Sequence, residues 1–370
     1  MTMSLLPRDA TRIAHAAAAA DAAGWLSHRQ QALLHQRGWL RMLAPRAVGG
    51  LEVDLPAAVR LEEAVAAQDG SMAWVLTLCA GAGWFAGFMA PPVARAIIGS
   101  RRVCIAGSGA VGGFADIAGS GAPDDSATGY RISGRWDYAS GAPMATHLTL
   151  NARVRRRGEL VLDDAGAPLI RAFIVPRRLV TMQPSWRSIG LRASASHSYA
   201  IEAGEIDGGH GFRIDAAAAT APGPLYRFPF MALAFVTLAA NLAGMAAHFL
   251  ALAHAAIGGR RHSPTGVPLL EVAGVAARLA QAGARLAAAR SEFYGLLDAA
   301  WLTVAAGAHL PAPAHAALQA SSKALVEAAR MAVDGIYPYC GLVAAGCDTE
   351  INRVWRDFHT ATQHSLLLPE

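Results

Sequence analysis

Hydrophobic and polar positions divide the chain into three blocks with different periodicities. Between residues 10 and 89, apolar side chains recur at the spacing of amphipathic helices, and Gly or Pro interrupts the pattern. At Asp69-Gly70-Ser71 we expect one helix to stop and Ser71 to cap the next. The first block is therefore predicted to be helical, with an Ala-rich opening helix and further helices over 25–38, 55–68 and 72–89.

Near Arg101 the pattern changes to short β-rich runs bounded by Gly, Asp and Pro. This spacing of strands and turns is typical of a small antiparallel barrel or sandwich. The predicted strands are 103–106, 130–138, 147–154, 170–175, 180–186 and 198–206.

After Pro224 helical periodicity returns and continues to the end, over 229–257, 268–302, 313–337 and 349–367. Helices, then strands, then helices is the order of an α+β fold. We therefore predict an N-terminal α-helical domain (1–100), a central antiparallel β-barrel or sandwich (101–215) and a C-terminal four-helix bundle (216–370).

The segment 228–259 carries no formal charge, and at about thirty residues it is long enough to cross a bilayer. It is rich in Ala, and it contains Asn241, His248 and His254, which are costly in hydrocarbon. We interpret it as a buried helix at the centre of the bundle or at an oligomer interface, and we expect no membrane association. The two histidines are interpreted as core residues.

Composition narrows the class of protein. A chain of 370 residues with 54% hydrophobic and 16% charged residues is not disordered, nor is it a coiled coil. Its 32 basic against 27 acidic residues are too small an excess to indicate nucleic-acid binding. No signal peptide is visible at the start of the chain. We expect a reduced cytoplasmic protein without structural zinc or disulfides, because no CxxC or metal-ligand spacing connects Cys79, Cys104, Cys340 and Cys347.

Five segments carry a family resemblance. They are GWLRMLAPRAVGGLEVDLP (38–56), DGSMAW (69–74), GYRISGRWDYASGAPMATH (129–147), WRSIGLRASAS (186–196) and INRVWRDFHTATQH (351–364). In this order, the sequence from Trp39 to His364 resembles the acyl-CoA dehydrogenase superfamily. The resemblance implies three domains (helical, β, four-helix), a flavin bound between the β domain and the C-terminal bundle, and a homotetramer.

The residues of the last predicted helix indicate which branch of the family the chain resembles. Dehydrogenases of the family carry a catalytic glutamate in an Ile-Tyr-Glu-Gly-Thr segment after the Arg-Asp pair, whereas Ser365 stands at that distance from Arg356-Asp357 here. A serine cannot remove a proton α to a thioester unaided. His364 and the segment WDYASG (136–141) instead resemble the two-component flavin-dependent monooxygenases of this fold.

That branch implies an enzyme which takes reduced FMN or FAD from a separate flavin reductase. Through a C4a-hydroperoxyflavin it would use O2 to oxygenate a small organic substrate, aromatic or polycyclic in the preferred hypothesis. By this resemblance His364 and Ser140 stabilise the hydroperoxyflavin with uncharged donors. Trp136 and Tyr138 would pack against the flavin ring, and Gly141 would let the backbone approach that ring closely.

Two further pairs are candidates for cofactor binding. Ser108 and Gly109, in a Gly-Ser-Gly loop, would offer backbone amides to the ring or its ribityl chain. Arg260 and Arg261 would bind the flavin phosphate of a neighbouring subunit with their guanidinium groups. A solvated loop is the alternative interpretation for the arginines. Some members of the branch have a histidine where this chain has Cys79, and a buried thiol is a poor proton donor.

Helical spacing places Arg353, Asp357, Thr360 and His364 on one face of the last helix. We interpret Arg353 and Asp357, one turn apart, as a structural ion pair. Two other hypotheses remain open at this stage: an acyl-CoA dehydrogenase with tightly bound FAD and an atypical base, and a non-catalytic flavin-binding or scaffolding relative. The colour of the purified protein discriminates among the three.

Overall fold

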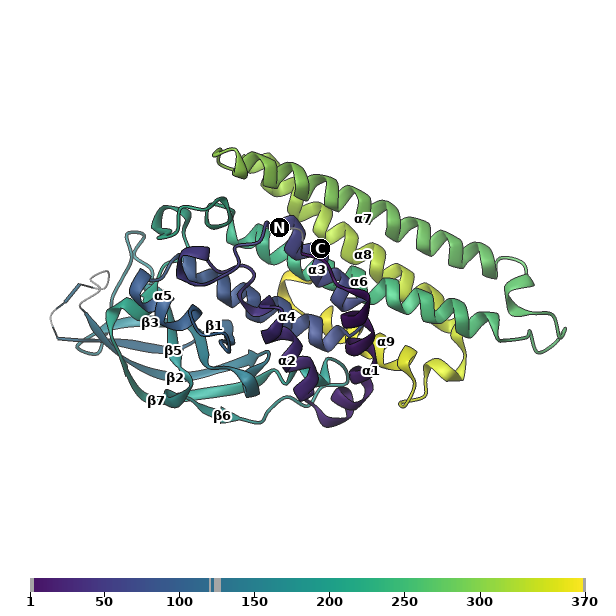
Figure 1. Cartoon of the computed structure of the whole chain (residues 1–370), viewed down its shortest axis with the longest axis horizontal. Helices are drawn as coiled ribbons and strands as arrows, with labels where there is room; N and C mark the ends of the chain where they lie inside the picture. The colour runs from purple at the N-terminus through teal and green to yellow at the C-terminus, as the bar shows by residue number, and fades with distance from the viewer. Residues whose placement is uncertain (1–2, 120, 123–127, 369–370) are drawn as a thin grey trace.

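The computed structural model describes residues 3–119, 121–122 and 128–368. It places helices first, one sheet next and long helices last (Figure 1), which confirms the α+β class. The first helices are α1 (Pro7–Ala23), α2 (His28–Gln36), α3 (Leu55–Ala66), α4 (Gly70–Trp84) and α5 (Pro91–Ile98). The last are α6 (Phe230–Gly258), α7 (Val275–Ala305), α8 (Ala312–Cys340) and α9 (Glu350–Ala361).

The strands form one sheet in the order β6-β7-β2-β1-β3-β5-β8, with β4 paired to β3. Its strands are β1 (Ile105–Ala118), β2 (Gly129–Ala139), β3 (His147–Arg156), β4 (Glu159–Leu160), β5 (Ile170–Pro176), β6 (Thr181–Gln183), β7 (His197–Ile206) and β8 (Gly211–Phe212). The predicted antiparallel barrel or sandwich is wrong in one respect, because β1 and β3 are parallel and the sheet is mixed. The chain leaves β2 through a turn and a short 3-10 segment, and returns on the other side of β1.

Strand β1 is much longer than the predicted 103–106, because a glycine-rich run continues it. A Cβ on Gly107 would lie 2.0 Å from the Thr149 hydroxyl, and one on Gly113 would lie 2.1 Å from the Ser133 carbonyl oxygen. The glycines therefore let neighbouring strands approach more closely than side chains would permit.

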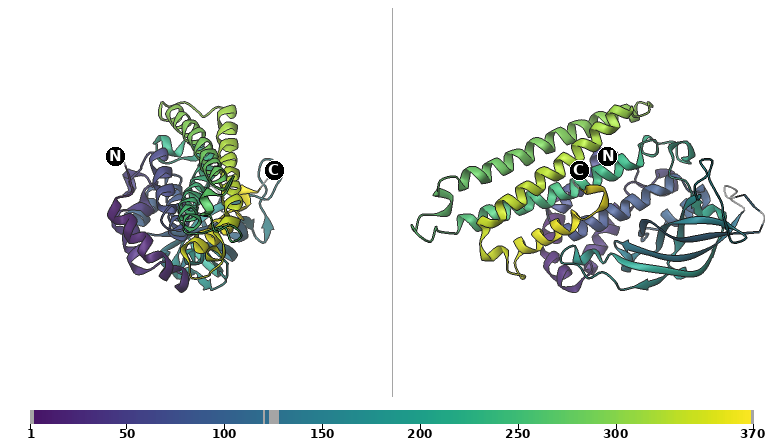
Figure 2. Two further views of the ribbon diagram at one scale, coloured as in Figure 1. Left: turned by 90° about the vertical axis from the view of Figure 1, so that its right-hand side faces the viewer. Right: turned by 180° about the vertical axis from the view of Figure 1, so that it is seen from behind.

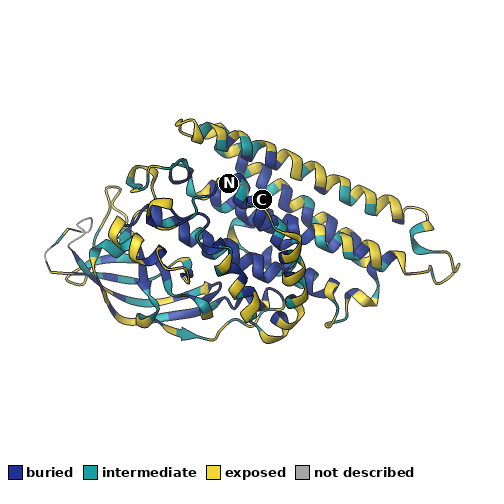
Figure 3. Ribbon diagram, in the orientation of Figure 1, coloured by how far each residue is buried: buried dark blue, intermediate teal, exposed yellow. Residues whose placement is uncertain are grey.

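The apolar helix α6 is a core element, as predicted, but the interpretation of its two histidines as core residues is wrong for His254, which is exposed. Of its most apolar 18-residue window, 78% is buried inside the protein. It packs against α3 and α8, and Figure 3 shows it mostly dark blue, whereas the outer side of α7 is exposed. Figures 1 and 2 show α6, α7 and α8 running together away from the sheet, so one end of this bundle projects from the body.

A buried polar group lies among α3, α4 and α6. Glu62 is fully buried, and Asn241 Nδ2 donates a hydrogen bond of 2.6 Å to the Thr77 hydroxyl beside it. Burial raises the pKa of Glu62 to about 8, and the Thr77 hydroxyl offsets only part of this effect. Glu62 is therefore a neutral acid in the folded protein at neutral pH.

A second buried acid, Asp357 of α9, holds the β domain. Its Oδ1 accepts a hydrogen bond of 2.5 Å from the Leu191 N–H, in the loop between β6 and β7. The preceding Gly190 is necessary there, because a Cβ would lie 2.0 Å from the Arg356 carbonyl oxygen. Burial, and next the charge of Asp69, raise the pKa of Asp357 to about 8.

Asp69 is the N-cap of α4. Its carboxylate accepts hydrogen bonds from the Ser71 and Met72 N–H groups and one of 2.6 Å from Gln30 of α2. This corrects the expectation that Ser71 is the cap. The helix begins two residues earlier than predicted, because the aspartate reaches the free amides before Ser71 can.

The predicted Arg353–Asp357 ion pair is also wrong. The Arg353 guanidinium pairs with Glu350 at 3.1 Å, toward the start of α9, and Asp357 turns to the backbone of Leu191. Arg356 makes an ion pair of 2.8 Å with Asp21 of α1, which joins α9 to the N-terminal helices. Helix α9 thus contacts both the N-terminal helices and the β domain.

We predict that Glu62→Gln flattens the pH dependence of stability. The pKa of Glu62 is higher in the folded protein than in the unfolded chain. Its contribution to the free energy of unfolding is therefore lost as the pH rises from the unfolded-state pKa toward 8. The loss has a slope of at most about 1.4 kcal/mol per pH unit. Urea unfolding between about pH 6 and pH 8 should show the wild type losing stability faster than the variant. The exposed Glu327→Gln is the control, and equal slopes in all proteins would contradict the prediction.

We predict that Asp357→Asn is tolerated and Asp357→Ala is not. Asparagine keeps the oxygen that accepts the Leu191 N–H and resembles the neutral acid, so it should cost less than about 1 kcal/mol. Alanine leaves that N–H without its acceptor and opens a cavity, which should cost about 2–4 kcal/mol. Denaturant unfolding at neutral pH measures both, and a similar cost for the two variants would show that the hydrogen bond matters little.

Candidate functional site

The turn after β2 packs directly on α4. Gly141 has φ of 74°, and a Cβ there would lie 3.0 Å from the Cys79 sulfur and 3.1 Å from a Val75 methyl carbon. Its N–H donates a hydrogen bond of 2.8 Å to the Ser194 carbonyl oxygen. Only glycine satisfies both the positive φ and the close contact, so the backbone of this turn lies flush against the helix.

Three buried serines form a chain of hydroxyl groups behind this turn. The Ser140 Oγ lies 2.8 Å from the Ser196 Oγ, which lies 2.7 Å from the Ser194 Oγ. Ser194 and Ser196 belong to a tight loop in which Leu191 and Ala195 have φ of 49° and 44°. Ser194 and Ser196 were not singled out from the sequence, although the RASAS pattern in a family segment was the available signal. They hold the Ser140 hydroxyl in place.

His364 lies outside helix α9, which ends at Ala361. It is an extended residue before the 3-10 segment 365–367, so the predicted helical face through His364 is not formed. Its imidazole is half-buried and meets the Trp74 ring edge-on, with centroids 5.9 Å apart. Helix α4 therefore supports His364 through Trp74 and the Ser140–Gly141 turn through its next residues.

The protonation state of His364 follows from its surroundings. Burial lowers the pKa of the imidazole, so it is neutral at pH 7. Its Nδ1 accepts a hydrogen bond of 3.3 Å from the Leu366 N–H. A neutral imidazole that accepts at Nδ1 carries its proton on Nε2. His364 is therefore a hydrogen-bond donor at Nε2 and has no lone pair there to act as a base.

Two aromatic residues of β2 differ in what they can contact. Tyr138 is 70% exposed, with φ of 66°, and its ring meets the Trp186 ring edge-on at 6.3 Å. Its ring is accessible next to the Ser140–Gly141 turn, and its contact with a flavin remains a prediction. Trp136 is 1% exposed, its indole N–H donates to the Asn151 carbonyl oxygen, and its ring stacks on Tyr199. The expectation that the Trp136 ring walls a flavin is therefore wrong, because the core of the β domain encloses it.

Ser108 and Gly109 form a bulge within β1 rather than a loop. The register of β1 against β3 shifts between Gly107 and Val111, and Asn151 Nδ2 donates a hydrogen bond of 2.9 Å to the Gly109 carbonyl oxygen. Because β1 and β2 are antiparallel, the bulge lies toward the end of the sheet where β2 leads into Ser140. Contact of its amides with a cofactor remains a prediction.

The arginine pair lies elsewhere in the chain. Arg260 and Arg261 are exposed in the connection between α6 and α7, at the end of the bundle that projects from the body (Figure 1). Arg260 donates a hydrogen bond of 2.6 Å to the Tyr339 carbonyl oxygen, and Arg261 one of 2.9 Å to that of Gly266. Within one chain they do not meet His364 or Ser140, so their predicted role requires a second subunit.

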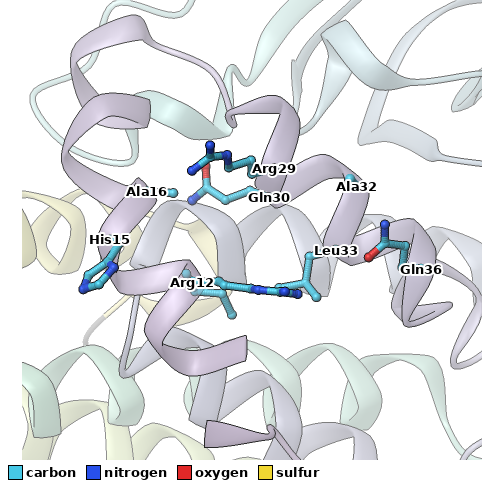
Figure 4. A pocket seen from close by; sticks show the side chains of 9 residues that line it. Arg12, His15, Ala16, Arg29, Gln30, Ala32, Leu33 and Gln36 are labelled. Carbon is cyan, nitrogen blue, oxygen red and sulfur yellow. The ribbon is translucent and has the colours of Figure 1, made fainter. Parts of the chain in front are cut away.

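A groove of about 470 Å³ opens between α1 and α2 (Figure 4). Arg12, His15 and Arg29 line it together with apolar side chains such as Leu33. None of the predicted site residues lies in its lining, so this groove is separate from the candidate site. Within the described part of the chain, no group of three or more His, Cys, Asp or Glu side chains could hold a metal ion.

The sequence of this chain is similar to those of several known proteins. Residues 236–369 match the model of the acyl-CoA dehydrogenase C-terminal domain. Indole-3-acetate monooxygenase of Pseudomonas putida is 27% identical over 89% of this chain and 81% of its own length. The oxygenase subunit HsaA of a flavin-dependent monooxygenase of Rhodococcus jostii is 23% identical, over 91% of this chain and 87% of that protein.

A solved structure agrees. The complex of XiaF from Streptomyces with FADH2 and glycerol superposes with a TM-score of 0.85, covering 97% of this chain and 89% of that one at 20% identity. This likeness shows the fold. Together with the family model matched by residues 236–369, it shows that the chain has the acyl-CoA dehydrogenase fold and is similar in sequence to flavin-dependent monooxygenases of that fold.

Proposed function

We propose that this chain is the oxygenase component of a two-component flavin-dependent monooxygenase. It takes reduced FMN or FAD from a separate reductase and uses O2 to insert one oxygen atom into a small organic substrate. The observation that carries the proposal is His364, a neutral Nε2–H donor that packs on Trp74 of α4, the same helix against which the Ser140–Gly141 turn packs. The oxygenase subunit among the relatives supports the separate reductase.

The residues at this place fit a flavin. A planar ring needs a flat surface, and Tyr138 offers an exposed aromatic ring next to the Ser140–Gly141 turn, which Gly141 lets pack closely on α4. Reduced flavin, when bound, supplies the electrons that activate dioxygen. Ser140, oriented by Ser196, and His364 donate hydrogen bonds without bringing a permanent charge into a buried site.

The same geometry argues against the dehydrogenase alternative. Removal of a proton α to a thioester requires a base with a free lone pair. The Nε2 of His364 is protonated, and Ser365, where the family's glutamate would fall, is an exposed serine. Asp357 of α9 is buried and engaged with Leu191. No observation on this chain favours the scaffolding alternative.

The substrate in this proposal is an apolar aromatic molecule. The side of α4 between Trp74 and Phe85 carries Leu78 and Gly81, and a Cβ on Gly81 would meet nothing within 4 Å. An apolar surface with space above it suits a flat, uncharged ring. The relative named for indole-3-acetate acts on a molecule that contains such a ring, although that molecule also carries a carboxylate.

The proposal includes a homotetramer in the cytoplasm. Leu302, Met331 and Leu342 leave apolar side chains exposed on and after α7 and α8, at 69%, 52% and 89%. A bundle that projects with exposed apolar side chains is suited to packing against other copies. Such packing would also bring Arg260 and Arg261 to a neighbouring subunit's flavin phosphate.

We predict that His364→Ala uncouples oxygen consumption from product formation. Rapid mixing of protein, reduced flavin and an aromatic substrate such as indole with oxygenated buffer measures product, hydrogen peroxide and flavin oxidation. The variant should lose about a hundredfold in product rate and release peroxide instead. His364→Gln, which keeps an N–H donor, should retain more activity. The exposed His254→Ala is the matched control, and an unaffected His364→Ala would overturn the mechanism.

The pH profile gives a second readout of the same residue. Because burial lowers the pKa of His364, the neutral donor predominates at pH 7, and activity falls as the imidazole is protonated in more acidic buffer. His364→Gln should lack this acid limb. If the activity of the wild type and of His364→Gln falls at the same acidic pH, the titrating group is not His364.

We predict that Arg260→Ala/Arg261→Ala weakens binding of reduced FMN by about tenfold and leaves riboflavin binding unchanged. Anaerobic equilibrium dialysis measures both ligands, because only FMN carries the phosphate. The exposed Arg285→Ala is the control. If the arginines serve a neighbouring subunit, mixing this variant with His364→Ala before reassembly should give more activity at limiting FMN than either variant has alone. Absence of this gain, with FMN and riboflavin equally affected, would contradict the predicted role.

A further inference from the structure

Two buried thiols meet beside the candidate site. The sulfur atoms of Cys79 on α4 and Cys104, just before β1, lie 3.7 Å apart, and the residues are 1% and 0% exposed. The Cys79 sulfur also lies 3.5 Å from the Ser140 carbonyl oxygen. The contact joins the N-terminal helices to the sheet at the Ser140–Gly141 turn.

We propose that Cys79 and Cys104 are a reversible oxidation site, which hydrogen peroxide converts to a disulfide. Cys79 attacks peroxide, the O–O bond breaks, and a sulfenic acid and water form. The Cys104 sulfur then displaces the sulfenic oxygen as a second water, and the S–S bond forms. The two thiols lose two electrons and two protons, and one peroxide is reduced to two waters.

The geometry favours this pair. A disulfide has an S–S distance of about 2.05 Å, so the sulfurs have to approach by roughly 1.7 Å from their present contact. The Cys104 S–H points at the Cys79 sulfur, and this contact together with burial raises the pKa of the Cys104 thiol. Cys104 therefore holds its proton, and Cys79 is the sulfur that meets peroxide first.

The other cysteines do not share this arrangement. Cys340 is buried and its thiol lies 3.6 Å from the Ile336 carbonyl oxygen of its own helix. Cys347 is exposed. They are internal controls, since one is buried without a thiol neighbour and the other is accessible to any oxidant in solution.

The source of peroxide rests on the proposed function. A flavin site that activates O2 without substrate releases hydrogen peroxide next to the Ser140–Gly141 turn, which Cys79 contacts. A disulfide draws the Cys79 sulfur toward Cys104 and away from that turn. The turn then loses its support on α4, flavin binds less well, and further peroxide production slows. The pair thus limits wasteful oxygen consumption at its origin.

The test uses the full-length protein with its native cysteines. After incubation with hydrogen peroxide, remaining thiols are alkylated, and intact mass and peptide mapping locate the losses. We expect one peptide linking Cys79 to Cys104, an intact Cys340 thiol, and full recovery of the linked thiols with dithiothreitol, whatever the oxidation of exposed Cys347. Cys104→Ser should abolish the link and Cys340→Ser should not. The proposal would be overturned if Cys79 and Cys104 were alkylated as completely as Cys340, or if Cys79 were overoxidised without forming the link.

A second arm separates this site from the proposed function. The protein turns over reduced flavin in air without substrate, with catalase present to remove peroxide from solution. A link formed under catalase supports peroxide release next to the pair, and reduced-flavin binding should then fall until dithiothreitol restores it. If the disulfide forms with added peroxide but not during turnover under catalase, the oxidation site stands. The local source of peroxide is then contradicted, and so is this support for oxygen chemistry at Ser140.

Discussion

The buried hydrogen bond from the Leu191 N–H to Asp357 is the contact on which the site depends. It joins α9 of the C-terminal bundle to the loop that carries Ser194 and Ser196, and those serines orient Ser140. The same helix leads directly into the segment that brings His364 against α4. One neutral acid thus sets the relative position of both donor groups. A shift at this point moves Ser140 and His364 relative to each other, without touching either.

The helices and most strands could be predicted because periodicity records which side of an element faces the core. Strands β3 and β5 begin at the predicted residues, and α6 begins within one residue of its predicted start. The pattern of a strand does not show which other strand it pairs with. Nothing in the local pattern says that β3 returns beside β1 in parallel, and the glycine run of β1 has no side chains with which to show an alternation.

The site could be predicted in part, for a similar reason. His364, Ser140 and Gly141 were found through family segments, but Trp136 and Tyr138, two residues apart in one strand, were assigned to the same wall. The register of β2 against β7 shifts between Trp136 and Ala139, and Tyr138 has φ of 66°, so the two rings separate into core and surface. The Ser194–Ser196 network was missed because it forms only when two distant loops meet.

Burial favours the neutral form of three titratable groups in this protein, and that bears on the chemistry the site can offer. Burial raises the pKa of Glu62 and Asp357 and lowers that of His364, so each is held in its neutral form near pH 7. Gly141 packs so closely on Cys79 that an imidazole at that position would displace the turn. Among the described residues that line the turn, proton donation therefore falls to His364 and the Ser140 hydroxyl, and the thiol that occupies the remaining place is free for redox chemistry.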